Sequence, residues 1–214
     1  QGFTEKYGME YRKAYWDEQV DVGLLQRHER EIFPLLHQRR RFAEVTDFVF
    51  YNFATSYGNV DENVFAYSNF GEGRHSLVLY NNRFGQTSGY VRQSVSFVVK
   101  KPDGEKYTTQ KTLSESLRLH DDPGSYVVLH DAIRDLSYVR PSQQICKEGL
   151  YFTLNGYQTF VFNEIYEVQD DEEGTWRKLN SWLNGNGTSD INEAIQELLY
   201  HDVLEPYRNC FDGD

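Results

Sequence analysis

The sequence predicts a mainly β protein: an antiparallel β-sandwich with an N-terminal loop-helix segment and two C-terminal helices. Three observations support this fold class. Aromatic residues, which favour strands, make up 15% of the chain. Between residues 48 and 168, short apolar runs alternate with turn signals at nearly regular spacing, as in sandwiches and barrels. On either side of this region the apolar residues recur at helical spacing.

The central region is expected to consist of strands separated by Gly- and Asp-rich turns. Gly71-Glu72-Gly73 and Asp122-Pro123-Gly124 are such turns. Asn155-Gly156, between two aromatic-rich runs, predicts a two-residue hairpin. The expected strands are Phe48–Phe53, Val64–Ser68, Ser76–Asn81, Tyr90–Val99, Tyr107–Leu113, Tyr126–His130, Leu136–Arg140, Leu150–Leu154 and Thr159–Val168.

The N-terminal part predicts a loop followed by a helix. Residues 1–20 have no clear period, whereas Asp21 is a suitable cap for a helix with apolar positions between Leu24 and Leu36. Pro34 is expected to kink this helix or to mark the start of a second helical segment. Arg39-Arg40-Arg41 fits the helix end, where cations are favoured, better than a nucleic-acid patch. His28 fits a hydrogen-bonded packing role better than a metal ligand.

The C-terminal part predicts two helices after the acidic connector 170–173. Trp176, Leu179 and Leu183 form the apolar stripe of the first. Asp190 and Glu193 resemble a capping box that begins the second, and Pro206 ends it.

Composition restricts the partners of the chain. With 22 basic and 33 acidic residues, the net charge of −11 repels nucleic acid and anionic membrane surfaces, but it does not repel a neutral polymer such as a glucan. No apolar run approaches the roughly 20 residues of a membrane helix. Cys146 and Cys210 are expected to be reduced thiols of a cytoplasmic protein rather than one disulfide bridge. The start, Gln1-Gly2-Phe3, has the character of a cut end.

Motifs that carry chemistry are absent from the sequence. It contains no Walker loop, no His-Glu-x-x-His and no Gly-x-Ser-x-Gly, so we expect no cofactor and no metal. Asp61-Glu62 and Asp121-Asp122 lie beside turn signals, where carboxylates ordinarily face solvent, and neither is expected to be a catalytic pair. Aromatic side chains such as Trp182 can stack on sugar rings, although each is more often part of a core.

Several segments resemble a bacterial branch of the α-amylase family of glycoside hydrolases. Gly2-Phe3-Thr4-Glu5-Lys6-Tyr7-Gly8-Met9-Glu10-Tyr11-Arg12 resembles the segment after the last strand of the catalytic β/α barrel. Residues 63–69 and 76–82 are similar to the opening strands of the C-terminal domain of that family, and residues 150–168 to its closing strands. The resemblance covers most of residues 1–168, and residues 175–214 are not required by the family pattern.

The resemblance implies three parts: residues 1–45 as the end of the catalytic barrel, 46–170 as the C-terminal β-sandwich domain, and 171–214 as a helical tail. It places the catalytic acids of the family upstream of residue 1, so no catalytic residue is expected here and the chain alone is expected to be inactive. The segment after a barrel strand lies on the face where barrel active sites are built. Glu5, Lys6, Tyr7 and Tyr11 are therefore candidates to line a substrate cleft, the alternative being that they pack on the barrel rim.

Two other functions remain open at this point. A carbohydrate-binding module would need an exposed row of aromatic side chains on one sheet face. A protein-interaction module would use the apolar side of the helix at 24–36, which seeks a partner if no barrel covers it. The expected partners are accordingly the N-terminal barrel of the same protein, or a second copy in its absence, with an α-glucan as a further candidate.

Overall fold

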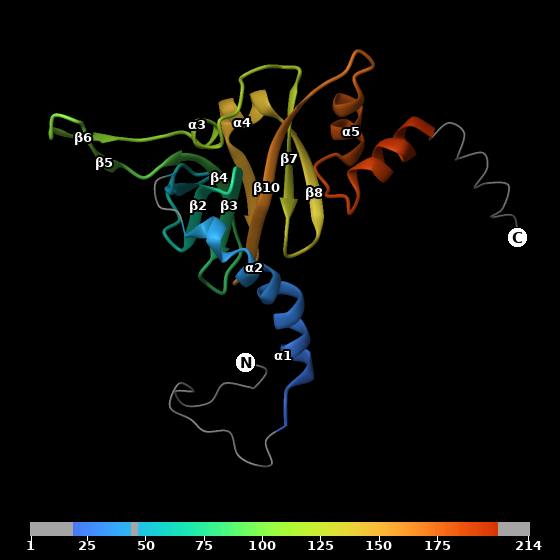
Figure 1. Ribbon diagram of the computed structural model, residues 1–214, viewed down its shortest axis with the longest axis horizontal. Helices are drawn as coiled ribbons and strands as arrows, with labels where there is room; N and C mark the ends of the chain where they lie inside the picture. The colour runs from blue at the N-terminus through green and yellow to red at the C-terminus, as the bar shows by residue number, and fades with distance from the viewer. Residues whose placement is uncertain (1–18, 44–46, 201–214) are drawn as a thin grey trace, which may run out of the picture.

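The computed structural model describes residues 19–43 and 47–200 (Figure 1). Eight strands form one antiparallel sheet in the order β8-β7-β10-β3-β2-β1-β4-β9, and β5 and β6 form a separate hairpin. This confirms the mainly β, antiparallel fold class. The strands are β1 (Val49–Thr55), β2 (Val64–Gly71), β3 (Arg74–Asn81), β4 (Thr87–Ser94), β5 (Phe97–Lys100), β6 (Lys106–Thr109), β7 (Ser125–Asp131), β8 (Leu136–Pro141), β9 (Leu150–Leu154) and β10 (Thr159–Gln169).

The large sheet curls around a single main core. Inward side chains from both halves of the sheet meet there, including Phe53 on β1, Leu79 on β3, Leu129 on β7 and Leu154 on β9. Two halves of one curled sheet thus take the place of the two layers of a sandwich. The edge strands β8 and β9 do not pair with each other, yet residues of both line one cavity. The curl therefore leaves a seam between its two edges.

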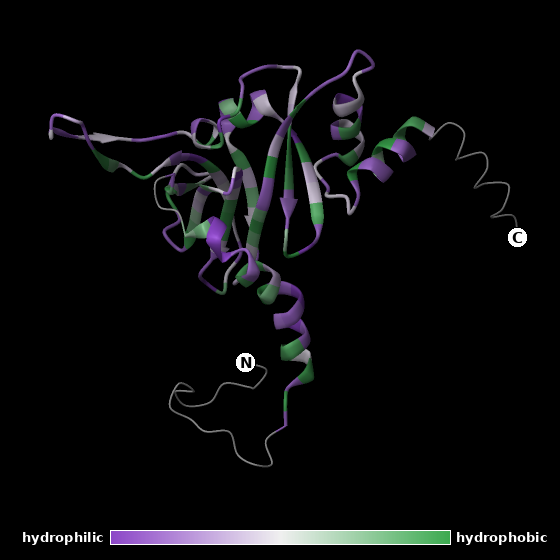
Figure 2. Cartoon of the chain, in the orientation of Figure 1, coloured by the Kyte–Doolittle hydropathy of each residue, from purple (hydrophilic) through white to green (hydrophobic). Residues whose placement is uncertain are grey.

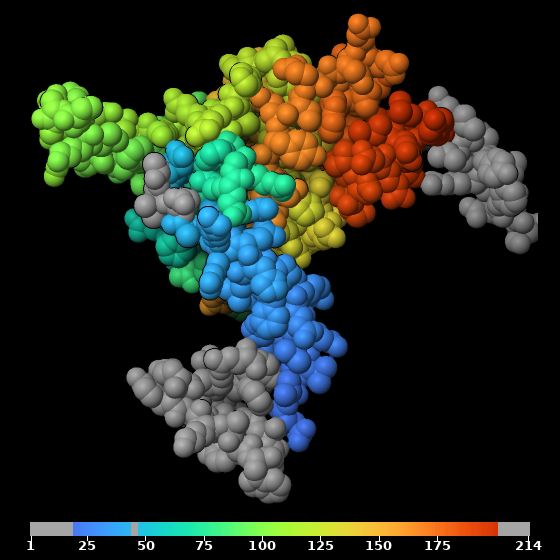
Figure 3. All heavy atoms as spheres, viewed as in Figure 1, coloured from blue at the N-terminus to red at the C-terminus, as the bar shows by residue number. Residues whose placement is uncertain are grey.

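Two predicted strands are shorter than expected. The stretch 90–99 divides into β4 and β5, because the Ser94 amide bonds to the carbonyl of Lys111 at 2.8 Å and the chain turns away. Residues 97–109 then extend from the body as the β5–β6 arm (Figures 1 and 3). The strand predicted over 107–113 ends at Thr109, and Leu113 begins α3 (Leu113–Leu117), which is capped by Thr112 and Glu115. The other short helix, α4 (Ser142–Glu148), follows β8 and was also not predicted.

The prediction of a two-residue hairpin at Asn155-Gly156 is wrong. A turn is present, but β9 pairs with β4, whereas β10 pairs with β3 and β7. The connection crosses from one edge of the curled sheet to its other half. The positive φ that a two-residue turn would place at Asn155 and Gly156 occurs at Tyr157 instead (56°), so the local turn also differs from the expected one.

The N-terminal helical part, residues 22–42, changes type along its length. It consists of α1 (Val22–Arg27), a π-helix (His28–Ile32), α2 (Phe33–His37) and a 3₁₀ turn (Arg39–Phe42). Pro34 explains the π-helix, since its ring collides with the carbonyl four residues earlier in a regular α-helix. The predicted cap is confirmed, because Asp21 accepts a hydrogen bond from the Leu24 amide at 2.9 Å. The predicted interruption at Pro34 is confirmed as well.

The tail packs on the outer face of β7, β8 and β10. Its helices are α5 (Thr175–Leu183) and a second helix over 191–200. Leu179 and Leu183 form a second core with Tyr126 of β7 and Val139 of β8. This confirms the predicted apolar stripe. The predicted start of the second helix is also confirmed, since the Asp190 side chain accepts from the amides of residues 192 and 193.

Candidate functional site

The substrate-cleft candidates Glu5, Lys6, Tyr7 and Tyr11 lie outside the described residues, as does Cys210. Of the aromatic residues considered for sugar stacking, Trp176 packs against the tail core, and Trp182 is 41% exposed.

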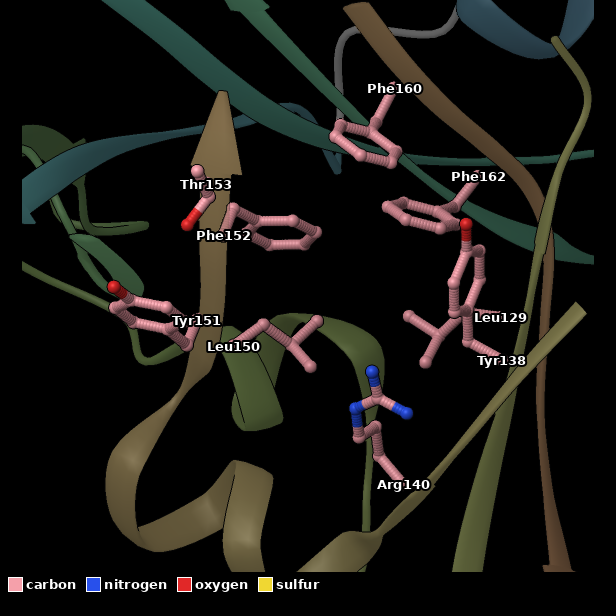
Figure 4. A pocket seen from close by; sticks show the side chains of 9 residues that line it. All are labelled: Leu129, Tyr138, Arg140, Leu150, Tyr151, Phe152, Thr153, Phe160 and Phe162. Atoms are coloured by element: carbon pink, nitrogen blue, oxygen red, sulfur yellow. The ribbon is translucent and has the colours of Figure 1, made fainter. Parts of the chain in front are cut away.

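A cavity of about 160 Å³ lies at the seam of the curled sheet, and we call it the seam cavity (Figure 4). Strand alternation explains its lining on β8. Tyr138 and Arg140 point inward, while Val139 between them points outward into the tail core. The lining residues are Leu129, Tyr138, Arg140, Leu150, Tyr151, Phe152, Thr153, Phe160 and Phe162.

Aromatic rings form the apolar wall of the seam cavity. The rings of Phe160 and Phe162 are stacked, with centroids 5.7 Å apart, and Phe152 lies 5.6 Å from Phe160. Tyr138 meets Phe162 edge-on at 6.1 Å. These contacts join β8, β9 and β10 across the interior of the curl and hold the rings in fixed positions.

Arg140 supplies the single charged group of this lining, and Figure 4 shows its guanidinium directed toward the space between the rings. It donates hydrogen bonds to the carbonyls of Val139 (2.7 Å) and Gly185 (2.8 Å). Within the described part of the chain, no carboxylate lies at ion-pair distance from it. Burial lowers the pKa of the Arg140 guanidinium, which is the response of a desolvated cation lacking a nearby anion.

A second candidate lies at the end of the sheet where loops 56–63, 82–86 and 155–158 meet, and we call it the loop end. The rings of Phe84 and Tyr157 are 87% and 58% exposed, and their centroids lie 6.5 Å apart. Buried Asn81 ties the two loops together, because its amide donates to the carbonyls of Gly85 (2.8 Å) and Asn155 (2.9 Å). The exposed rings therefore stand on a firmly bonded support.

A polar cleft of about 590 Å³ adjoins these loops and includes Tyr57, Asp61 and Arg83. Arg83 pairs with Asp61 at 3.1 Å, and the Thr87 hydroxyl donates to Asp61 at 2.7 Å. Burial alone would raise the pKa of Asp61, but hydrogen bonds from Thr87 and Asn63 and the charge of Arg83 bring it below its ordinary value. Asp61 is therefore a fixed anion of the cleft.

One carboxylate of each pair considered from the sequence, Asp61 in the first and Asp122 in the second, is hydrogen-bonded to neighbouring side chains that lower its pKa. Asp61 is only 8% exposed, so the expectation that it faces solvent is wrong, and Thr87, Asn63 and Arg83 occupy its oxygens. Hydrogen bonds from Ser125 and Gln169 lower the pKa of Asp122. A general acid needs a raised pKa, and neither carboxylate has one.

Arg140 was missed at the sequence level, although a signal was present. In the predicted strand Leu136–Arg140, alternation already places Tyr138 and Arg140 on one face. Which face is inward, and that β9 and β10 supply the opposite wall, depend on the curl.

The remaining chemistry of the described residues is sparse. No three His, Cys, Asp or Glu side chains gather there as metal ligands would. Cys146 of α4 is a free thiol, and burial raises its pKa. No helix in residues 19–43 or 47–200 is long and apolar enough to cross a bilayer.

Comparisons with protein families, with curated proteins and with solved structures find no match to this chain.

Proposed function

We propose that this chain is the non-catalytic C-terminal portion of an α-amylase-family enzyme that acts on α-glucans. In this proposal, residues 22–42 are the closing helix of a catalytic barrel, and the curled sheet supports that helix from outside the barrel. The resemblance of residues 2–12 to the segment after the last barrel strand suggests the family.

The observation that carries the proposal is the exposure of the helical part. From Val22 to Phe42 no residue is buried. Ile32, Phe33 and Leu36 lie within one turn of one another and are 42%, 39% and 56% exposed. The segment extends away from the sheet, with hydrophobic stretches along it (Figure 2). A large exposed apolar surface on a helix is typical of an interface, here with a barrel.

The attachment of this helix to the sheet fits a supporting role. Arg41 donates to the carbonyl of Asn163 on β10 at 3.3 Å, and the Asn163 amide donates to Gln38 at 2.9 Å. Arg41 and Arg40 also lie 3.6 and 3.8 Å from Glu72, at the β2–β3 turn. The end of the helix is thus fixed to the sheet, while its N-terminal turns remain available for a second domain.

The test begins with the reading frame upstream of Gln1, which we expect to encode a β/α barrel with its catalytic carboxylates. The protein containing that barrel is expected to act on maltooligosaccharides, and residues 1–214 alone are expected to be inactive. A frame without a barrel, or turnover by residues 1–214 that vanishes on mutating one internal carboxylate, would overturn the proposal.

A second candidate function, carbohydrate binding, is favoured by the loop end. Exposed rings match the apolar faces of pyranoses, and the neighbouring Asp61–Arg83 pair offers planar groups for sugar hydroxyls. The outer face of the sheet also carries exposed aromatic rings, among them Phe65 on β2 (40% exposed) and Tyr151 on β9 (52% exposed). Burying two such rings on a neutral ligand removes apolar surface from water without opposing the net negative charge.

Calorimetric titration with maltoheptaose tests this second candidate. Phe84→Ala and Tyr157→Ala are each expected to weaken binding about tenfold, since stacked rings contribute on the order of 1 kcal/mol or more. Tyr107→Ala is the matched control, because Tyr107 is 44% exposed but lies on the β5–β6 arm. Equal affinity for all variants would exclude the loop end as a sugar site.

A further inference from the structure

We infer that the seam cavity binds a small monocarboxylate that carries one six-membered ring, with the carboxylate on Arg140 and the ring among Phe152, Phe160 and Phe162. This site goes beyond the proposed function and does not depend on it. It stands on the size of the cavity, the chemistry of its wall and the position of one unpaired cation.

The size of the cavity fits one ring. A volume of about 160 Å³ is close to that of apolar protein cavities that take up benzene. Away from Arg140, most of the cavity lining is aromatic or aliphatic, so water finds few hydrogen-bond partners there. Phe152 and Phe160 are only partly buried although they belong to the core, because their rings face this space. An apolar ligand ring in the cavity would give Phe152 and Phe160 the van der Waals contacts that they lack on this side.

The charge of Arg140 selects the anion. Burying a cation without an anion is costly, and natural proteins pair most such charges. Arg134, in the turn between β7 and β8, follows that rule, since it donates to buried Asp131 at 2.5 Å while its guanidinium lies over the Phe160 ring. Arg140 lacks such a partner among the described residues. A ligand carboxylate supplies what Asp131 supplies to Arg134.

The orientation of Arg140 leaves room for that carboxylate. Its hydrogen bonds to the carbonyls of Val139 and Gly185 use one hydrogen on each terminal nitrogen. A guanidinium has five such donors in a planar fork, so three remain for a planar two-oxygen acceptor. The Gly185 carbonyl holds this arrangement because residue 185 has a φ of 87°, which glycine adopts without strain. Tyr151, 52% exposed, marks the outer rim through which a ligand enters.

The experiment titrates the full chain with benzoate, benzamide and acetate and follows the Arg140 Nε–H and the phenylalanine rings by NMR. Benzoate is expected to shift these resonances and to give cross-peaks between its ring protons and Phe152 or Phe160. Benzamide has the ring without the charge, and acetate the charge without the ring. Both are expected to bind at least about tenfold more weakly than benzoate. Benzamide lacks the charge interaction with Arg140, and acetate lacks the ring contacts with the phenylalanines.

Arg140→Met is the test variant, and Arg92→Met, an exposed arginine of β4, is the matched control. We expect Arg140→Met to remove the preference for benzoate over benzamide and Arg92→Met to retain it. If Arg140→Met does not fold, the three-ligand comparison on the unchanged chain still decides. Absence of benzoate binding, or equal affinity for benzoate and benzamide, would overturn the inference. The inference would also be overturned if light scattering showed a dimer through the β8 and β9 edges and that dimer did not bind benzoate.

Discussion

The carboxylate of Asp131 has no exposed surface, and it accepts a hydrogen bond from Arg134 at 2.5 Å. Two backbone amides, of Ile133 and Val161, also donate to it. Asp131 therefore fixes the β7–β8 turn and the start of β10 around one buried anion.

Replacing that anion tests its contribution. Asp131→Ala is expected to lower the free energy of unfolding by about 3 kcal/mol, the lower end for a broken buried pair, because Arg134 is 29% exposed and can regain water. Urea unfolding at neutral pH measures this loss. Glu172→Ala, an exposed change in the acidic connector, serves as the control and should alter stability by less than about 0.5 kcal/mol. Equal losses in the two variants would contradict the assignment.

The second core makes the tail part of the folded unit. Leu179→Ala removes a side chain with no exposed surface and is expected to cost about 2–5 kcal/mol in one cooperative unfolding transition. Leu199→Ala, at a position 51% exposed in the following helix, should cost under about 0.5 kcal/mol. A separate early transition that alone responds to Leu179→Ala would mean that the tail unfolds independently of the sheet.

His120 and Glu167 form an ion pair between the loop after α3 and strand β10. The hydrogen bond to Glu167, and then its charge, raise the pKa of His120 above its ordinary 6.5. Burial alone would raise the pKa of Glu167, but hydrogen bonds from His120 and Ser142 bring it below 4.5. The contribution of His120 is complete below pH 6.5 and is lost as pH rises through the raised pKa. That of Glu167 is complete above pH 4.5 and is lost as pH falls through the lowered one.

An NMR titration of the His120 ring checks this pair. We expect a midpoint above pH 6.5 in the unchanged chain and a lower midpoint in Glu167→Gln, which keeps the shape of the side chain but not the charge. A His120 midpoint that Glu167→Gln leaves in place would refute the pair.

Gly156 joins the two loops that carry Phe84 and Tyr157. A Cβ at residue 156 would lie 2.0 Å from the Phe84 carbonyl oxygen, so Gly156→Ala forces the loops apart. The expected loss is about 1–3 kcal/mol, as for other overpacked positions, together with weaker maltoheptaose binding if the loop end is a sugar site. Gly23→Ala meets nothing closer than 3.4 Å in α1 and should leave the unfolding midpoint unchanged or slightly higher. Similar unfolding midpoints for the two variants would show that the loops do not depend on this contact.

Local signals in the sequence located most of the fold. Turn residues and alternation identified the strands of the large sheet within a few positions, and the side chains of Asp21 and Asp190 identified the starts of two helices. These features depend on neighbours within four residues, which is what a sequence pattern contains. The helix α3 could have been found in the same way, because Thr112 and Glu115 form a complete capping box.

Local sequence patterns could not predict which distant strands pair. Asn155-Gly156 predicted a hairpin, but β9 pairs with β4, whereas β10 pairs with β3 and β7 in the other half of the curled sheet. The seam cavity is a product of the same curl, since its walls come from strands that are not neighbours in the sheet. Alternation places Arg140 on the same strand face as Tyr138, but no local pattern indicates that this face is the inner one.

The open seam has a further consequence for the solubility of the folded chain. A curled sheet whose two edge strands do not pair with each other leaves both edges able to pair with strands of other molecules, and such edges promote aggregation. The edge of β8 is guarded by the tail, because Ser137 and Thr188 exchange backbone hydrogen bonds at 2.8 and 2.9 Å. Residues 171–200 thus serve as an edge cover, and a chain ending before Gly174 would present β8 to other molecules.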